Sequence, residues 1–270
     1  MAITSNFPAI RPSLNLDFAN AKALDPRITF SRASAATYYD GKTVAKAEEN
    51  LFISSQLFSS AGWVLAYSSI VSNSSVAPDG TATATKLLAD NSQNYHGIRQ
   101  GLSLPAGNVY TVSVYAKAAE FSKLYFSDLA NGRVAARFDL VSLSSDNPAS
   151  SPGYLASSVS DIGGGWRRCV VTFSAGSSTI SLGFTGYPDT GANLGLYGAN
   201  YTGDGTSGIY IWGAQLEQRS QVTAYTPTTT QPIINYIPVL QTALAGVPRF
   251  DHNPVTGESL GLLGVISRCL

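Results

Sequence analysis

The middle of the chain is dominated by an alternation of apolar and polar residues. In residues 108–118 (NVYTVSVYAKA), every second residue from Tyr110 to Ala116 is apolar. This period of two predicts a strand with one face in a core. Tyr115 and Lys117 then stand on the opposite face, where a partner or a ligand could reach them.

The same period recurs in five further segments, and turn-forming Gly, Asn, Asp and Pro residues separate them. These segments are residues 122–127, 133–140, 165–173, 179–184 and 209–216. Helical periodicity is weak, and its best candidate, residues 40–50 (DGKTVAKAEEN), has apolar side chains too few and too small for a stripe. We interpret it as a hairpin or a short helical turn. The pattern predicts an all-β protein, an antiparallel β-sandwich with a jelly roll as the first choice.

The two ends of the chain differ from this middle. Residues 1–49 are predicted to form an extended attachment arm, in which residues 27–31 (RITFS) are the clearest strand-like piece. Residues 50–226 are predicted to form the jelly roll. Residues 227–270 combine a proline-rich extended segment with a terminal β-hairpin, whose turn lies in residues 251–259 (DHNPVTGES).

Two strands carry tryptophans whose orientation follows from the alternation. In residues 165–173 the inward set is Cys169, Val171 and Phe173, which leaves Trp166 half exposed beside Arg168. In residues 209–216 (IYIWGAQL) the predicted inward set is Tyr210, Trp212, Ala214 and Leu216. We therefore interpret Trp212 as a core residue before considering it as a sugar-binding one.

The chain carries few charges, and the positive and negative ones balance, which argues against strongly charged partners. Only 13% of the residues are charged, with 17 basic and 17 acidic side chains, so neither nucleic acid nor an anionic membrane is an expected partner. No run of about 18 apolar residues occurs, and the N-terminus lacks the pattern of a secretion signal. The only cysteines, Cys169 and Cys269, make no disulfide framework, and we expect Cys169 to be buried.

The sequence contains few residue patterns that are typical of enzymes. The two histidines, His96 and His252, have no metal-ligand spacing with each other or with cysteine, and the common zinc and nucleophile motifs are missing. Distant strands could still bring two carboxylates together for glycoside hydrolysis, although most acids here sit in turns. We predict no enzymatic activity, no metal and no cofactor.

Seven separated segments carry a resemblance to a known group of proteins. They are LDPRITFSRASAATYYDGKTVAKAEENL from Leu24, APDGTATATKL from Ala77, YTVSVYAKA from Tyr110, GGGWRRCVVT from Gly163, GDGTSGIYIWGAQLE from Gly203, VTAYTPTTTQPI from Val222 and VPRFDHNPVTGESLGLL from Val247. In this order they resemble bacteriophage virion proteins, tail-fibre-like or head-appendage proteins with a carbohydrate-binding-module-like jelly roll. The resemblance covers most of the chain.

This resemblance implies a virion structural protein, either a capsid decoration, a head fibre or a tail appendage, assembled in the host cytoplasm. Its partners would be other virion proteins and itself, as a homotrimer. Many of the proteins it resembles continue after the hairpin with an Ile-Glu-Glu segment and a further jelly roll, whereas here GVISRCL follows Leu263. This departure favours a docking or trimerising role for the hairpin.

A glycan-binding adhesin that attaches the particle to host polysaccharide is the alternative, and a depolymerase ranks last. Sugar sites combine flat aromatic faces with amides or carboxylates. The candidate glycan-binding residues are Tyr95, His96, Tyr115, Tyr187, Asp189, Tyr197 and Tyr201. The candidate subunit or virion contacts are Arg27, Phe30, Tyr236, Arg249, Phe250 and His252.

Overall fold

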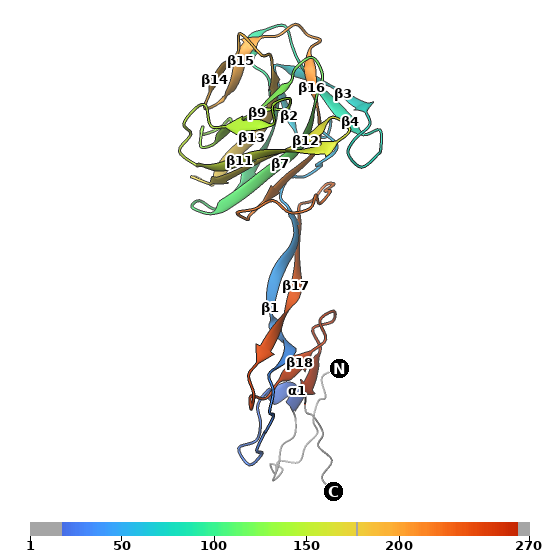
Figure 1. Ribbon diagram of the computed structural model, residues 1–270, viewed down its shortest axis with the longest axis vertical. Coiled ribbons are helices and arrows are strands. Elements are labelled where there is room, and N and C mark those ends of the chain that lie inside the picture. Colours follow the sequence, from blue (N-terminus) through green and yellow to red (C-terminus); the bar gives the residue numbers. More distant parts are fainter. Residues whose placement is uncertain (1–17, 177, 264–270) are drawn as a thin grey trace. The chain divides into compact units, whose positions relative to one another are not determined.

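The computed structural model describes residues 18–176 and 178–263, and nearly all of its regular elements are strands (Figure 1). The chain forms two units by its internal contacts. One is residues 48–234, which we call the sandwich unit. The other joins residues of both ends, and its described parts, residues 18–47 and 235–263, are called the paired-ends unit. Among the described residues, no helix is long and apolar enough to span a membrane.

Two six-stranded antiparallel sheets form the sandwich unit, and each is named after one of its strands. The β8 sheet contains, in spatial order, β10 (Ser144–Asp146), β9 (Ala135–Asp139), β8 (Lys123–Asp128), β13 (Thr179–Tyr187), β6 (Gly97–Ser103) and β2 (Val64–Ala66). The β7 sheet contains β11 (Tyr154–Gly163), β12 (Trp166–Ser174), β7 (Val109–Ala118), β16 (Gly208–Glu217), β4 (Ala84–Ala89) and β3 (Ser68–Ser75). The predicted antiparallel jelly-roll sandwich is confirmed.

The main core contains side chains from the inner faces of both sheets. Strand β7 contributes every second residue from Tyr110 to Ala116, as the alternation predicts. Strand β12 contributes Cys169, Val171 and Phe173, also as predicted. The β8 sheet contributes residues such as Phe126 and Phe184, whose ring centroids lie 5.7 Å apart. These large apolar side chains bury the area that stabilises the sandwich.

The predicted inward set of β16 is wrong in its first half. Ile209 and Ile211 enter the main core, while Trp212 packs on the other side of the sheet, in a separate cluster with Trp166. The cause is a β-bulge between Trp212 and Gln215, where Gly213 adopts a φ of +63°. One extra residue reverses the alternation, so that Ala214 and Leu216 again point inward.

Trp166 is buried rather than half exposed, which corrects the second tryptophan prediction. Its indole Nε1 donates to the carbonyl oxygen of Val76 (3.0 Å), and its ring belongs to the cluster of Trp212. The guanidinium of Arg168 instead lies over the ring of Tyr115, 5.2 Å from its centroid. Part of the outer face of the β7 sheet is thus covered by a cluster of aromatic side chains.

A third, three-stranded sheet also belongs to the sandwich unit. We call it the β15 sheet, and its order is β14 (Asn193–Gly195), β15 (Gly198–Thr202) and β5 (Gln93–Tyr95). Beneath it lies a second buried cluster that includes Tyr125, Tyr187 and Tyr201. Because Tyr125 and Tyr187 belong to β8 and β13, this cluster joins the β15 sheet to the outer face of the β8 sheet.

The paired-ends unit is built from short, mostly two-stranded pieces. Strand β1 (Ala36–Asn50) pairs with β17 (Ile233–Ala243), β18 (Phe250–His252) pairs with β19 (Ser259–Leu262), and α1 spans Phe18–Ala21. Residues 40–50 therefore lie within one long strand, so the predicted hairpin or helical turn is wrong. No strand forms at residues 27–31, whereas the predicted terminal hairpin is present as β18 and β19.

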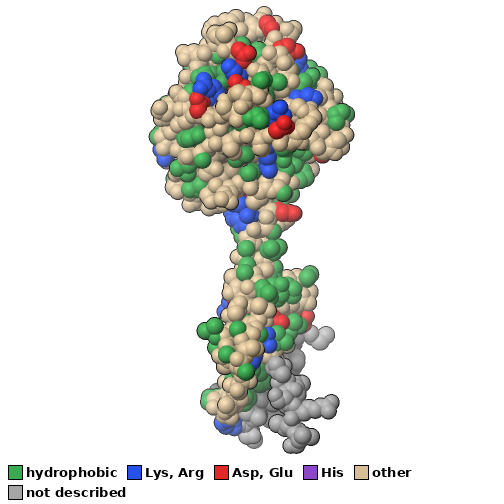
Figure 2. Space-filling view, in the orientation of Figure 1, with side chains coloured by type: hydrophobic (Ala, Val, Ile, Leu, Met, Phe, Trp, Pro, Cys, Tyr) green, Lys and Arg blue, Asp and Glu red, His purple; other side chains and the backbone are tan. Residues whose placement is uncertain are grey.

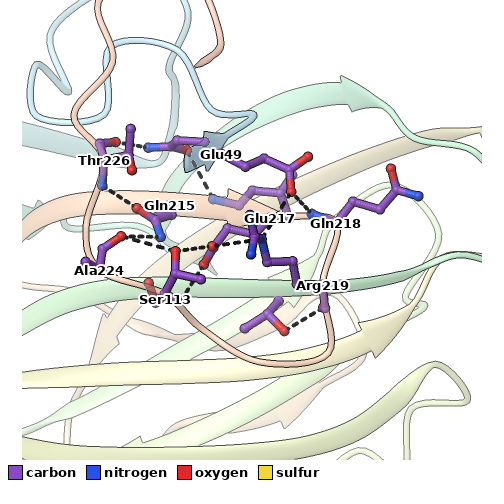
Figure 3. A network of polar contacts seen from close by, with 12 residues as sticks. Glu49, Ser113, Gln215, Glu217, Gln218, Arg219, Ala224 and Thr226 are labelled. Carbon is purple, nitrogen blue, oxygen red and sulfur yellow. Dashed lines mark hydrogen bonds and ion pairs between the residues drawn. The ribbon is translucent and has the colours of Figure 1, made fainter. Parts of the chain in front are cut away.

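A buried polar network surrounds the end of β16 in the sandwich unit (Figure 3). The amide Nδ2 of Asn50 donates to the carbonyl oxygens of Ala214 (3.0 Å) and Thr226 (2.8 Å). The side chain of Gln215 donates to the carbonyl oxygen of Ala224 (3.1 Å) and accepts from the N–H of Thr226 (2.6 Å). These bonds hold the segment after β16 against the sandwich, because buried backbone groups need partners.

Two buried carboxylates, Glu49 and Glu217, belong to the same network. Glu49 accepts from the N–H of Gln218 (2.8 Å), and Glu217 accepts from the N–H of Thr223 (3.1 Å). The Nε of Arg219 lies 4.0 Å from Glu49 and 3.8 Å from Glu217. Buried charges are tolerated where such partners compensate them. Backbone donors and a cation thus engage the pair, which gives it a structural role.

Candidate functional site

The outer face of the β8 sheet carries two rows of polar side chains that face away from the main core. The strand register sets both rows, because residues directly opposite on paired strands project from the same face. The first row is Ser144, Asp139, Lys123 and Tyr187, on β10, β9, β8 and β13. The second row is Asp146, Arg137, Tyr125 and Thr185, on the same four strands.

Between these rows the surface is hollowed. The hollow has a volume of about 270 Å³ and is lined by Lys123, Arg137, Asp139, Ser144, Ser145 and Asp146. Its size is close to the lower end of small-ligand sites, roughly 300 Å³. Every side chain in the lining is charged or carries a hydroxyl, so the hollow presents polar side chains only.

Arg137 and Asp146 form an ion pair across the second row. The Nε of Arg137 donates to Oδ1 of Asp146 at 2.9 Å, and its Nη2 donates to Oδ2. The hydrogen bond to Asp146 raises the pKa of Arg137. Exposed pairs of this kind contribute only about 0.2–1 kcal/mol to stability. The pair therefore matters more for fixing a flat guanidinium and a flat carboxylate in the hollow.

Asp139 is held in one orientation by the turn that follows β9. Its Oδ1 accepts from the backbone N–H groups of Val141 (2.9 Å) and Ser142 (3.0 Å). The hydrogen bond from Ser142 is the largest cause of a lowered pKa of Asp139. A general acid needs a raised pKa, so Asp139 is suited to accept hydrogen bonds rather than to donate a proton in catalysis.

Lys123 connects the hollow to Asp189. The Nζ of Lys123 lies 3.4 Å from Oδ1 of Asp189, and Ser122 Oγ donates to the same oxygen at 3.0 Å. The side chain of Asp189 is 67% exposed, as expected for a residue that a ligand could reach. Asp189 thus lies beside the hollow and is one of the residues that the sequence predicts for glycan binding.

Two tyrosine rings lie buried beneath the same face. The rings of Tyr125 and Tyr187 meet edge to face, with centroids 6.2 Å apart, and Tyr125 donates to the carbonyl oxygen of Gly195 (2.9 Å). The hydroxyl of Tyr187 is buried and has no hydrogen-bond partner among the described residues. Burial raises the pKa of Tyr187, so the hydroxyl keeps its proton. An unpartnered buried hydroxyl costs about 1–3 kcal/mol. Tyr187 is therefore a buried part of the fold and does not line the hollow.

The structure divides the predicted glycan-binding residues into exposed and buried ones. Tyr95, Tyr197 and Asp189 are exposed, and their binding role stays a prediction. The expectation that His96, Tyr187 and Tyr201 lie outside the core is wrong, since they are 2%, 3% and 2% exposed.

Three of the predicted glycan-binding side chains, those of His96, Tyr201 and Tyr115, have partners within the fold. The ring nitrogens of His96 lie within hydrogen-bond distance of the carbonyl oxygens of Tyr67 and Tyr201. The hydroxyl of Tyr201 donates to the carbonyl oxygen of Gly186 at 2.6 Å. Tyr115 is half buried and packs edge to face against Trp212 and Tyr225. We therefore do not carry these three residues into the binding site.

The sequence interpretation missed the residues that line the hollow, although a signal for two of them was present. In residues 133–140 (RVAARFDL), Ala136 and Phe138 enter the main core, and Arg137 and Asp139 alternate with them. The alternation thus places both charges on one outer face. It does not show that Lys123 and Asp146 lie opposite them, because that depends on the pairing of three strands.

The residues predicted to contact other subunits or virion proteins all lie in the paired-ends unit, and they differ in how exposed they are. Arg27 is exposed and pairs with Asp25 (2.7 Å), and Tyr236 is 53% exposed. Phe30, Phe250 and Arg249 are partly buried.

His252 is buried, which contradicts the expectation that it is available for contact. Its Nδ1 lies 3.1 Å from the carbonyl oxygen of Tyr39. Its ring also lies so close to Gly41 that a Cβ there would come within 2.5 Å of it.

The part of the chain that the structure describes contains no cluster of metal-binding side chains. No group of three or more His, Cys, Asp or Glu side chains there could hold a metal ion.

Comparison with known proteins finds similar solved structures but no similar sequences. No protein-family model matches the chain, and no curated protein matches it. Among solved structures, the CBM22-1–GH10 modules of Clostridium thermocellum endo-1,4-β-D-xylanase 10B, complexed with xylohexaose, match with a TM-score of 0.34 and 12% identity. That match covers 65% of this chain and 29% of the xylanase chain.

Two further structures are similar at the same level. A CBM4 structure matches with a TM-score of 0.33 and 16% identity, covering 58% of this chain and 86% of its own. The mannan-recognising carbohydrate-binding module TmCBM27 matches with a TM-score of 0.30 and 16% identity, covering 66% and 99%. At these scores no ligand is transferred to this chain, and the hollow has to be interpreted from its own residues.

Proposed function

We propose that the sandwich unit binds a glycan and that the hollow on the β8 sheet is the binding site. The observation that carries this proposal is the mixed lining, in which two cations, two carboxylates and two serines face one small volume. Vicinal hydroxyls of a sugar donate and accept at the same time, so they match a surface that offers both kinds of partner.

The charges of the hollow favour a neutral sugar. Lys123 and Arg137 contribute two positive charges, and Asp139 and Asp146 contribute two negative ones, so the sum for the lining is 2 − 2 = 0. Figure 2 likewise shows acidic and basic side chains in mixed groups on the sandwich unit, without a broad patch of one sign. A uronic acid or a sulfated sugar would meet carboxylates without a compensating excess of cations.

The test is a panel of neutral, acidic and amino sugars presented as monosaccharides, oligosaccharides and polysaccharides. Asp139→Asn keeps the shape and the accepting oxygen but removes the charge, and we expect it to weaken binding about tenfold, because hydrogen bonds to charged groups are worth about 1.5–3 kcal/mol. Lys42→Ala, an exposed cation of the paired-ends unit, is the matched control and should bind normally. Failure of the unaltered protein to bind any member would reject the proposal.

We also propose that the paired-ends unit attaches the protein to copies of itself and to other virion proteins. The supporting observation is a strand without a core, since Tyr236, Ile237 and Leu240 of β17 are each at least half exposed. Two-stranded ribbons are marginally stable in water by themselves, so contacts between copies would stabilise this one. The virion role itself rests on the resemblance of the sequence to phage appendage proteins.

Self-association and virion location have separate tests. Sedimentation of the full chain at micromolar concentrations should show a trimer, and Ile237→Ser with Leu240→Ser should shift it toward monomer. A monomer at every concentration would contradict self-association. Antibody labelling of purified phage particles tests the location, and particles without label would contradict the virion role.

A further inference from the structure

The outer face of the β15 sheet carries a second set of sugar-compatible side chains. Asn193, Asn200 and Tyr95 lie directly opposite one another on β14, β15 and β5, so they form one row on one face. Thr202 and Gln93 form the neighbouring row on the same face. The opposite face is the packed one, because it contains Ala199 and Tyr201 of the buried cluster.

Hydrogen bonds order the amides of this face. Gln93 Nε2 donates to Oδ1 of Asn200 at 2.8 Å, and Thr202 Oγ1 donates to Oε1 of Gln93. Within the described residues, the NH2 group of Asn200 makes no hydrogen bond and is thus available to a ligand. Ordering amides before a ligand arrives reduces the entropy that binding would otherwise cost.

Tyr95 provides an aromatic surface beside these amides. It is 37% exposed, and a Cβ at Gly198 would come within 3.2 Å of its Cδ1. A side chain on the neighbouring strand would therefore displace the ring, and glycine lets it lie close to the sheet. The exposed part of such a ring can pack against the apolar face of a pyranose.

The β15 sheet is anchored to the same outer face that carries the hollow. Tyr125, in the second row of that face, donates to the carbonyl oxygen of Gly195 at the end of β14. β14 is one of the two edge strands of the β15 sheet, and its Asn193 begins the row of Asn193, Asn200 and Tyr95. Tyr201 packs edge to face on Phe121, with centroids 5.7 Å apart, which keeps the sheet in place from below.

We propose that the outer face of the β15 sheet is a second subsite, continuous with the hollow, so that the ligand is a chain of several sugar residues. This inference rests on the proposed glycan-binding function of the hollow. One sugar residue occupies the hollow, and a later residue of the same chain stacks on Tyr95 while its hydroxyls bond to Asn200 and Gln93. Affinity is therefore a property of chain length as well as of sugar type.

The experiment is calorimetry of the full chain with linear homo-oligosaccharides of one to six residues, made of hexoses, N-acetylhexosamines or hexuronic acids. For the series that binds, affinity should rise with length, and Tyr95→Ala should weaken the six-residue member about tenfold while leaving the shortest binding member unchanged. Gln93→Ala, a second variant at an exposed position, should act in the same direction. Leu155→Ala, an exposed apolar side chain on β11, is the control and should change nothing.

Three other outcomes would decide against the inference. If Tyr95→Ala and Gln93→Ala bind the six-residue chain as the unaltered protein does, the second subsite is wrong while the hollow stands. If affinity stops rising after one or two residues, a continuous site is wrong as well. If no oligosaccharide binds at all, or if Asp139→Asn has no effect at any length, the proposed function of the hollow fails together with this inference.

Discussion

The two units of this chain are both built from antiparallel strands, yet they bury their side chains in different ways. The sandwich unit contains all three buried apolar clusters found among the described residues. The paired-ends unit contains none of them, and apolar side chains such as Ile237 and Leu244 are exposed there. Figure 2 shows apolar side chains on the surface of this unit. Pairing alone therefore does not stabilise a strand, because the apolar face must also be covered.

The patterns of two strands show the same difference. In β7, buried positions run almost continuously because both faces are covered. One face packs in the main core, and on the other Thr111 bonds to the carbonyl oxygen of Arg219 and Ser113 accepts from Arg168. In β17, only Ala243 is buried, and exposed positions include Ile234 and Tyr236. A strand with β-branched and aromatic residues on open faces is suited to a partner, which agrees with the proposed attachment role.

The strongest test of this comparison is a matched pair of large-to-small substitutions. Phe126→Ala removes a buried ring that packs on Phe173 and Phe184, and we expect a loss of about 3–5 kcal/mol in the free energy of unfolding. Ile237→Ala in the paired-ends unit should cost less than about 0.5 kcal/mol in a monomeric sample. Denaturant unfolding measures both, and equal losses would mean that the two units are stabilised in the same way.

A smaller effect is expected where the bulge of β16 depends on glycine. Gly213→Ala places a side chain at a φ of +63° and brings its Cβ within 3.0 Å of Tyr115, so it should cost about 1–2 kcal/mol or more. Gly205→Ala is the control, since Gly205 also has a positive φ, +76°, but nothing lies within 4 Å of the added Cβ. We expect Gly213→Ala to unfold at a lower temperature than Gly205→Ala, because only Gly213 is crowded. Equal unfolding temperatures would contradict the crowding at the bulge.

The smallest effect concerns the pH dependence of the hollow. Because the folded-state pKa of Asp139 is lowered, its charge is present above the unfolded pKa of about 3.9 and is lost only as pH falls through the lower folded value. Glycan affinity should therefore stay level from pH 8 to 5 and decline only below about pH 4. In Asp139→Asn, glycan affinity should fall less below pH 4, because the titrating carboxylate is gone. A marked loss of affinity already between pH 7 and 5 would point to a different group.

The sequence predicts the fold well where alternation is unbroken. The inward residues of β7 and β12 follow from their period of two, and the terminal hairpin follows from the Asn253-Pro254 and Thr256-Gly257 turn residues. The prediction that Trp212 is buried is confirmed, since its side chain is 3% exposed. The face predicted for it is wrong, because a single glycine in a left-handed conformation reverses the alternation in the middle of β16.

The candidate site is predicted less well, for reasons of tertiary structure. Tyr187 and Tyr201 come from a Gly-rich and Asn-rich region that suggests exposed loops, yet the β15 sheet covers both rings. The lining of the hollow comes from three strands whose register no local pattern specifies. Only the outward alternation of Arg137 and Asp139 is visible in the sequence itself.

The most direct test of the central claim is an NMR titration of the full chain with the oligosaccharide that binds best in the panel. We predict that the largest shift changes fall on Lys123, Arg137, Asp139 and residues 144–146, including the Nε–H signal of Arg137, and extend to Tyr95 and Asn200 with longer chains. Changes confined to the β7 sheet, near Trp166 and Trp212, or to the paired-ends unit would contradict the account, because they would place the sugar on a face other than the hollow.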